Sequence, residues 1–97
     1  MELSSKQRKI LEKAAINMEP VVIVGGNGVT PSLEKMVENC LKDHELIKIK
    51  FNEFKDEKKE LTLQIIEDTN ATLVRILGNV AILYKESDDP EKRRFKL

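Results

Sequence analysis

The residues of this chain best suited to holding a ligand are three glycines and an asparagine that stand together: Gly25, Gly26, Asn27 and Gly28. They follow an apolar run, Val21–Val24, and precede Thr30 and Pro31, a pair that favours the start of a helix. Between a strand and a helix, free backbone N–H groups and the positive end of the helix dipole attract an anion. Glycines also let the backbone turn sharply and come close to a bulky partner.

The spacing of these glycines matches neither of the two common phosphate-binding loops. No lysine-threonine or lysine-serine pair follows Gly28, which excludes a P-loop, and the spacing G-x-G-x-x-G of dinucleotide-binding proteins is absent. The remaining pattern is G-x-x-G, from Gly25 to Gly28, which suits a short loop that clamps the backbone of a nucleic acid. The alternative is a strand-to-helix turn that needs glycine only for a positive φ. This pattern by itself leaves both interpretations open.

Basic side chains are the second group of candidates, because they can neutralise the phosphates of a nucleic acid. The first predicted helix and one predicted strand carry the candidate RNA contacts Lys6, Arg8, Lys9, Lys13, Lys48 and Lys50. Four such residues on single-stranded phosphates would give a salt slope of about −3, from about −0.7 per phosphate. The alternative for each of them is a side chain that only keeps the surface solvated.

The charge balance limits how RNA could be attracted. The chain has 17 basic and 17 acidic residues, so its net charge is zero, whereas nucleic-acid-binding domains usually have a basic surplus. Any attraction must therefore come from a local patch. The acidic residues gather around the third predicted helix, at Glu53, Asp56, Glu57, Glu60, Glu67 and Asp68. This segregation is expected to leave a neutral protein with a basic side.

No constellation typical of an enzyme is present. The serines lie in no nucleophile motif, and the single histidine, His44, has no placed partner. The single cysteine, Cys40, lies on an apolar stripe and is expected in the core. One thiol and one histidine make a poor metal site. We therefore expect no catalysis, no metal, no cofactor and no small-molecule substrate.

The length of the chain predicts one domain, and its composition predicts the cellular compartment. A chain of 97 residues fits a single domain, which we place at 1–86, followed by a charged and loosely held tail at 87–97. No run approaches the roughly 20 apolar residues that cross a bilayer, and the polar start, Met1–Lys6, leads into no apolar signal-peptide core. A lone cysteine suits a reducing compartment. We expect a cytoplasmic protein with no membrane partner.

Apolar spacing predicts a helix on each side of the strand and glycine loop. The first helix runs from Ser4 to about Asn17, and Ser4 with Gln7 forms a capping box. The second begins after Thr30, ends near His44 and has the apolar stripe Leu33, Met36, Val37, Cys40 and Leu41. The run Val21–Val24 is continuous and β-branched, which is typical of a buried strand.

The second half predicts a strand, a helix and a hairpin. Leu46–Phe51 alternates apolar and basic residues, as a half-buried strand does. A helix follows over about Lys55–Thr69, and the strands 72–77 and 80–85 are joined by Gly78-Asn79, which suits a primed turn. The fold class is therefore α/β with the order α-β-α-β-α-β-β. Its first two strands should be parallel, in a right-handed βαβ unit.

Four stretches in order along the chain resemble the CRM domain, the family of the bacterial YhbY-type ribosome-associated RNA-binding proteins and, in repeated form, of chloroplast intron-splicing factors. The resemblance covers roughly Leu3 to Lys85. It is carried by Leu3–Arg8, Pro20–Thr30, His44–Lys50, and Gly78 followed by Leu83–Lys85.

The resemblance implies a four-stranded mixed sheet similar to that of the C-terminal domain of translation initiation factor three. It also implies binding to ribosomal RNA in precursors of the large ribosomal subunit during assembly. In the family, the G-x-x-G loop and the basic surface next to it contact RNA, which corresponds here to residues 25–28. Members tend to be basic and this chain is neutral, so its binding is expected to depend on a preformed particle in which ribosomal proteins add contacts.

Two functions follow as hypotheses from different classes. The first is a non-enzymatic RNA-binding protein that grips phosphate with loop amides. The second is a protein-interaction adaptor on ribosomal particles that touches no RNA, which the acidic third helix and the zero net charge favour. RNA binding should weaken steeply as salt rises, whereas an apolar protein interface should hardly change.

Overall fold

The computed structural model describes residues 1–97, and its elements follow the predicted order. The helices are α1 (Ser5–Ala15), α2 (Pro31–His44) and α3 (Lys58–Thr69), with short 3₁₀ turns at η1 (Lys55–Glu57) and η2 (Pro90–Lys92). The strands are β1 (Val22–Val24), β2 (Leu46–Phe51), β3 (Thr72–Leu77) and β4 (Val80–Tyr84). None of the helices is both long and apolar enough to cross a membrane.

The helix starts confirm the local signals in the sequence. The Ser4 hydroxyl accepts the Gln7 N–H at 3.1 Å, and the Gln7 side chain accepts the Ser4 N–H at 2.9 Å, so the capping box is complete. The Thr30 hydroxyl accepts the Leu33 N–H at 3.1 Å and caps α2. In the β3–β4 turn, Gly78 has a φ of +60° and is followed by Asn79, as in a primed hairpin turn.

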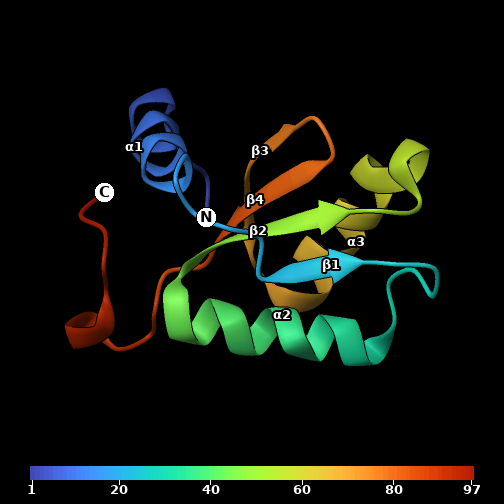
Figure 1. The fold of residues 1–97 in the computed structure, drawn as a ribbon. Helices are drawn as coiled ribbons and strands as arrows, with labels where there is room; N and C mark the ends of the chain where they lie inside the picture. The colour runs from blue at the N-terminus through green and yellow to red at the C-terminus, as the bar shows by residue number, and fades with distance from the viewer.

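The four strands form one mixed sheet in the order β1-β2-β4-β3. β1 and β2 are parallel, whereas β2 with β4 and β4 with β3 are antiparallel. Helices cover both faces: α2 and α3 pack on one, and α1 packs on the other (Figure 1). The predicted mixed α/β sheet is therefore confirmed, with three layers.

Alternation along β2 divides the interior into two cores. Ile47, Ile49 and Phe51 belong to the larger core, which includes Val37 and Leu41 of α2. Leu46 belongs to a smaller core on the opposite face, with Leu11 and Ala15 of α1. Lys48 and Lys50 therefore also lie on the face that α1 covers, since successive side chains of a strand point to opposite faces. This confirms the predicted half-buried strand.

The expectation that Val21–Val24 is buried on both faces is wrong. β1 is an edge strand, and although Val22 and Val24 are buried, Ile23 is 55% exposed. The reason is that α1 packs on β2, β3 and β4 and leaves this side of β1 open. Met36, predicted on the core stripe of α2, is likewise exposed.

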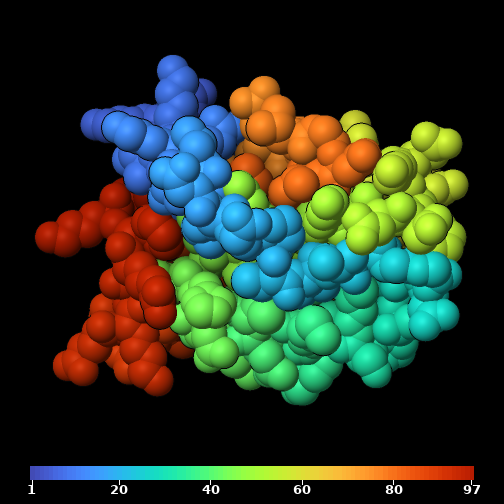
Figure 2. Space-filling model, in the orientation of Figure 1, coloured from blue at the N-terminus to red at the C-terminus, as the bar shows by residue number.

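The expectation of a loosely held tail is also wrong, because the buried carboxylate of Glu45 anchors it. Glu45, between α2 and β2, accepts the backbone N–H groups of Ser87 (2.6 Å) and Arg94. Phe95 then packs edge-on against the buried ring of Tyr84, with 6.1 Å between ring centroids. In Figure 2 the C-terminal segment (red) lies against the N-terminal one (blue).

Glu45→Ala is expected to lower the free energy of unfolding by about 1–3 kcal/mol, because two partly buried amides lose their acceptor. Urea unfolding would measure the loss. The control is Glu86→Ala, which removes only a half-exposed ion pair with Arg93 and should cost less than about 1 kcal/mol. Equal stability of Glu45→Ala and the wild type would show that the clamp on the tail does not stabilise the fold.

A second carboxyl group of interest, the half-buried side chain of Glu34 on α2, faces Asp68 of α3. Burial, followed by a hydrogen bond to Asp68 and the negative charges of Asp68 and Glu38, raises the pKa of Glu34 from 4.5 to about 7. Its Oε2 atom is buried and accepts no hydrogen bond from the chain. Protonation of Glu34 therefore favours the packing of these two helices.

The raised pKa predicts that stability falls as the pH rises through this range. Below pH 4.5 both states carry the proton, and between 4.5 and about 7 the folded state keeps a proton that the unfolded state has released. The stabilisation of the folded state by the protonated Glu34 carboxyl is fully present below pH 4.5 and is lost as the pH rises past about 7. Urea midpoints across the window should decline in the wild type and more weakly in Glu34→Gln. The exposed Glu67→Gln should retain the wild-type slope, and a Glu34→Gln slope identical to the wild type would contradict the assignment.

Candidate nucleic-acid interface

Residues 25–28 form a tight turn between the end of β1 and the start of α2. The Gly28 N–H donates to the Gly25 carbonyl at 3.0 Å, and Gly28 has a φ of +68°. That conformation favours glycine, whereas Gly25 and Gly26 have open space where a Cβ would stand. The turn interpretation therefore explains Gly28 and leaves Gly25 and Gly26 without a steric reason.

The exposed side of this loop presents free donors. The amides of Gly26 and Asn27 donate to no acceptor in the chain, and both residues are exposed. They lie just before the capped N-terminus of α2, where the helix dipole is positive. A hollow of about 300 Å³ beside them is lined by Ile23, Gly25, Gly26, Asn27, Gly28, Thr30, Ser32, Leu33 and Met36. No carboxylate lines it, so an anion there meets donors and no like charge.

The segment after β2 is also part of this site, and the sequence interpretation did not include it. The amides of Asn52 and Glu53 donate to the carbonyl of Val24, at 3.1 and 3.2 Å, which binds the segment to the end of β1. Phe54 then places its ring against Gly28: a Cβ at Gly28 would lie 3.4 Å from Cε2 of the ring. The parallel pairing of the first two strands could have predicted this, because their carboxyl ends share one edge of the sheet.

Three carboxylates of the acidic cluster come close to the loop. Glu53, Asp56 and Glu57 line a second hollow of about 670 Å³, together with Lys55 and Gly26. The expected separation of an acidic third helix from the loop is therefore incomplete. Phosphate is favoured on one side of the loop and disfavoured on the other.

Two of the predicted RNA contacts are used inside the fold. The guanidinium of Arg8 donates to the carbonyls of Val74 (3.0 Å) and Leu73 (3.4 Å), where the register of β3 shifts. Lys48 donates from Nζ to the carbonyls of Ile16 (3.3 Å) and Met18 (2.9 Å) and so caps the end of α1. Both cations are therefore held by main-chain carbonyls within the domain.

The other predicted basic residues are exposed, and their side chains make no ion pair or hydrogen bond in the chain. They are Lys6, Lys9, Lys13 and Lys50. Lys50 pairs with Ile23 across the sheet, one residue before the end of β2, and is the basic candidate nearest to the loop along the strands. Helix α1, which carries the other three lysines, lies toward the other end of the molecule (Figure 1). The structure thus places residues 25–28 and Lys50 near one edge and the α1 lysines apart from them.

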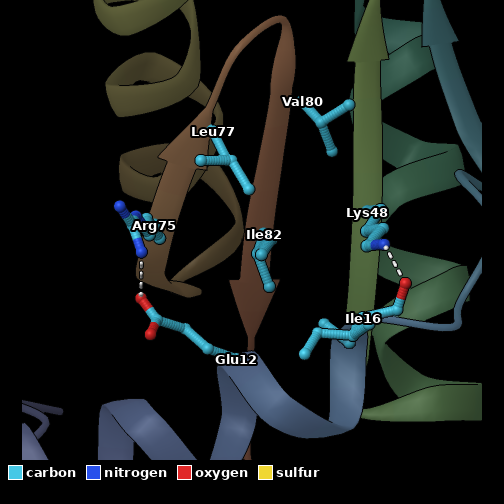
Figure 3. Close-up of a pocket in the computed structure, with 8 residues that line it drawn as sticks. Glu12, Ile16, Lys48, Arg75, Leu77, Val80 and Ile82 are labelled. Atoms are coloured by element: carbon cyan, nitrogen blue, oxygen red, sulfur yellow. Dashed lines mark hydrogen bonds and ion pairs between the residues drawn. The ribbon is translucent and has the colours of Figure 1, made fainter.

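A separate hollow of about 400 Å³ lies between the end of α1 and the sheet (Figure 3). Its walls are mainly apolar, and Ile16 and Leu77 are 69% and 58% exposed beside it. Its two cations are engaged: Arg75 lies 3.6 Å from the Glu12 carboxylate, and Lys48 caps α1. This surface suits apolar contact better than phosphate.

The arrangement defines a small three-layer α/β domain with donors exposed on a glycine loop at the edge of the sheet. The chain belongs to the CRS1/YhbY (CRM) domain family, whose model matches residues 3–85. The matched span contains the loop, Lys50 and the segment that carries Phe54.

Two relatives and one solved structure of similar length carry related names. An "RNA-binding protein" of Haemophilus influenzae is 39% identical over 88 residues, which cover 90% of this chain and 89% of the relative. The "probable RNA-binding protein YqeI" of Bacillus subtilis is 30% identical, with coverage of 90% and 92%. The solution structure of SAV1595 from Staphylococcus aureus, described as a candidate RNA-binding protein, has a TM-score of 0.78 and 31% sequence identity to this chain. The match covers 98% of this chain and 100% of SAV1595.

Proposed function

We propose that this protein binds RNA through the loop at residues 25–28. The observation that carries the proposal is the pair of exposed amides at Gly26 and Asn27, which have no acceptor in the chain and lie at the positive end of α2. A phosphate oxygen is a strong acceptor for two such donors. The names of the relatives in the CRM family support RNA as the source of that phosphate.

The exposed lysines extend the contact beyond the loop. Lys50 meets a neighbouring phosphate, and Lys6, Lys9 and Lys13 meet the backbone farther along. Because α1 and the loop lie apart, an RNA that touches both must extend across the sheet (Figure 1). This favours a folded RNA over a free nucleotide. Arg8 and Lys48 support the surface through the backbone carbonyls they hold.

The RNA we propose is ribosomal RNA in precursors of the large ribosomal subunit, met in the cytoplasm. A protein without net charge has little general attraction for RNA, so it gains most from a partner that offers additional contacts. A partly assembled ribosomal particle supplies both structured RNA and protein surfaces. The proposed role is binding during assembly, without a catalytic step or a cofactor.

A second candidate function is a protein-interaction adaptor on ribosomal particles. The apolar hollow beside α1 favours it, because Ile16 and Leu77 are exposed there and the nearby cations are already paired. Such a contact would be nearly insensitive to salt. The two functions use different surfaces and can be tested separately.

Gly26→Asp is expected to weaken RNA binding by roughly 10- to 100-fold, because a carboxylate would occupy the phosphate position. The substitution has open space and needs no positive φ, so the fold should persist. Affinity measured over a range of salt should give a slope of about −0.7 for each phosphate contact in the wild type, and a shallower slope in the variant. The control is Leu63→Asp, which makes the same charge change on an exposed position of α3. Equal loss in both variants would sink the role of the loop.

Crosslinking in cells tests the identity of the RNA. RNA recovered with the wild type under denaturing conditions should map to one region of the large-subunit ribosomal RNA, and the Gly26→Asp variant should lose those reads. Reads no richer than those of an unrelated neutral protein, together with salt-insensitive retention on ribosomal particles, would support the adaptor instead.

A further inference from the structure

We propose that the ring of Phe54 is a stacking platform for one unpaired base of the bound RNA. This inference rests on the proposed function of the loop, and it assigns to the same site a residue that reads a base as well as donors that hold a phosphate. It also states a property of the RNA: the nucleotide beside the loop is not base-paired.

Phe54 is the aromatic residue whose ring is available. Phe51 and Tyr84 are fully buried, and burial raises the pKa of Tyr84 to about 12. Phe95 packs against Tyr84. Phe54 is 41% exposed although it lies in the middle of a well-ordered connection. A large apolar ring that remains half in water is a contact surface when a planar partner lies within reach.

The backbone holds this ring in place. Phe54 has φ 54° and ψ 39°, a left-handed conformation that costs a phenylalanine on the order of 1 kcal/mol. It persists because the amides of Asn52 and Glu53 hold the Val24 carbonyl on one side, while the Phe54 carbonyl accepts the Glu57 N–H at 3.1 Å on the other. The turn thereby orients the ring toward the glycine loop, and little entropy remains to be lost on stacking.

The ring and the free amides belong to neighbouring parts of one surface. The ring packs on Gly28, and the amides of Gly26 and Asn27 lie two residues and one residue away, respectively, in the same tight turn. A nucleotide whose phosphate accepts from these amides has its base within reach of the ring, because sugar and base extend from the phosphate by about the length of a side chain.

The charges around the ring decide which part of the nucleotide can lie there. Glu53, Asp56 and Glu57 line the hollow that Phe54 shares with Gly26, and the only cation among its lining residues is Lys55. A phosphate would be repelled by the carboxylates, whereas a neutral base would not. The phosphate therefore lies on the neutral side of the loop and the base on the aromatic side.

The test compares Phe54→Leu with Phe54→Trp on large-subunit ribosomal RNA fragments transcribed in vitro. Leucine keeps an apolar contact with Gly28 but has no π face, so affinity should fall by roughly tenfold, while tryptophan should retain it. The control is Leu63→Ala, which removes an exposed apolar side chain of α3 and should leave affinity unchanged. Urea unfolding checks that each variant keeps its fold.

An abasic scan separates stacking from support of the loop. Removing the one stacked base should weaken binding to the wild type and should cause no further loss in Phe54→Leu. If Phe54→Leu binds as tightly as the wild type while Gly26→Asp does not bind, the platform is refuted and the phosphate loop stands. If neither variant loses affinity, the proposed function fails as well. Additive losses at every abasic position would show that Phe54 only supports the loop.

Discussion

The parallel pairing of β1 with β2 is the constraint on which the candidate site depends. Parallel strands end at the same edge of a sheet, so the glycine loop after β1 and the connection after β2 must lie side by side. The carbonyl of Val24 joins them by accepting two amides from the second segment. Without that pairing, the loop would be an isolated turn, and neither Phe54 nor the carboxylates near it would lie beside it. The βαβ unit thus builds a site with two unlike sides from segments some 25 residues apart in the chain.

The other end of the sheet serves stability. The oxygens of the buried Glu45 carboxylate accept hydrogen bonds from two amides of the C-terminal segment, and the Lys48 ammonium donates to carbonyls at the end of α1. Both residues belong to His44–Lys50, one of the four stretches that resemble the CRM family, and both bind the backbone of distant segments. The charges of Glu45 and Lys48 are therefore structural, because they are matched to main-chain groups within the domain, whereas Lys50 of the same stretch remains exposed.

A net charge of zero is compatible with RNA binding when some of the charged side chains bind main-chain groups inside the domain and the rest are exposed. Two of the six basic residues predicted to contact RNA are engaged inside the fold, and four remain exposed. The negative groups are partly engaged too, since Glu45 clamps the tail and Glu34 faces Asp68. At the loop, a partner meets neutral donors with Lys50 nearby on one side and the carboxylates of Glu53, Asp56 and Glu57 on the other. Counting charges along the chain cannot give this distribution.

The sequence by itself determined the elements and their order, because periodicity, capping residues and turn glycines act within a few residues of one another. Ser4 with Gln7, Thr30 with Pro31, and Gly78 with Asn79 marked their positions correctly for that reason. The loop at residues 25–28 was also found, since its glycines lie between a strand and a helix start. Only the tertiary structure decided that β1 is an edge strand, that Arg8 and Lys48 hold carbonyls, that the tail is anchored, and that Phe54 lies against Gly28. Each of these depends on contacts between residues far apart in the chain, and local pattern carries no information about which distant carbonyl, amide or ring a side chain will meet.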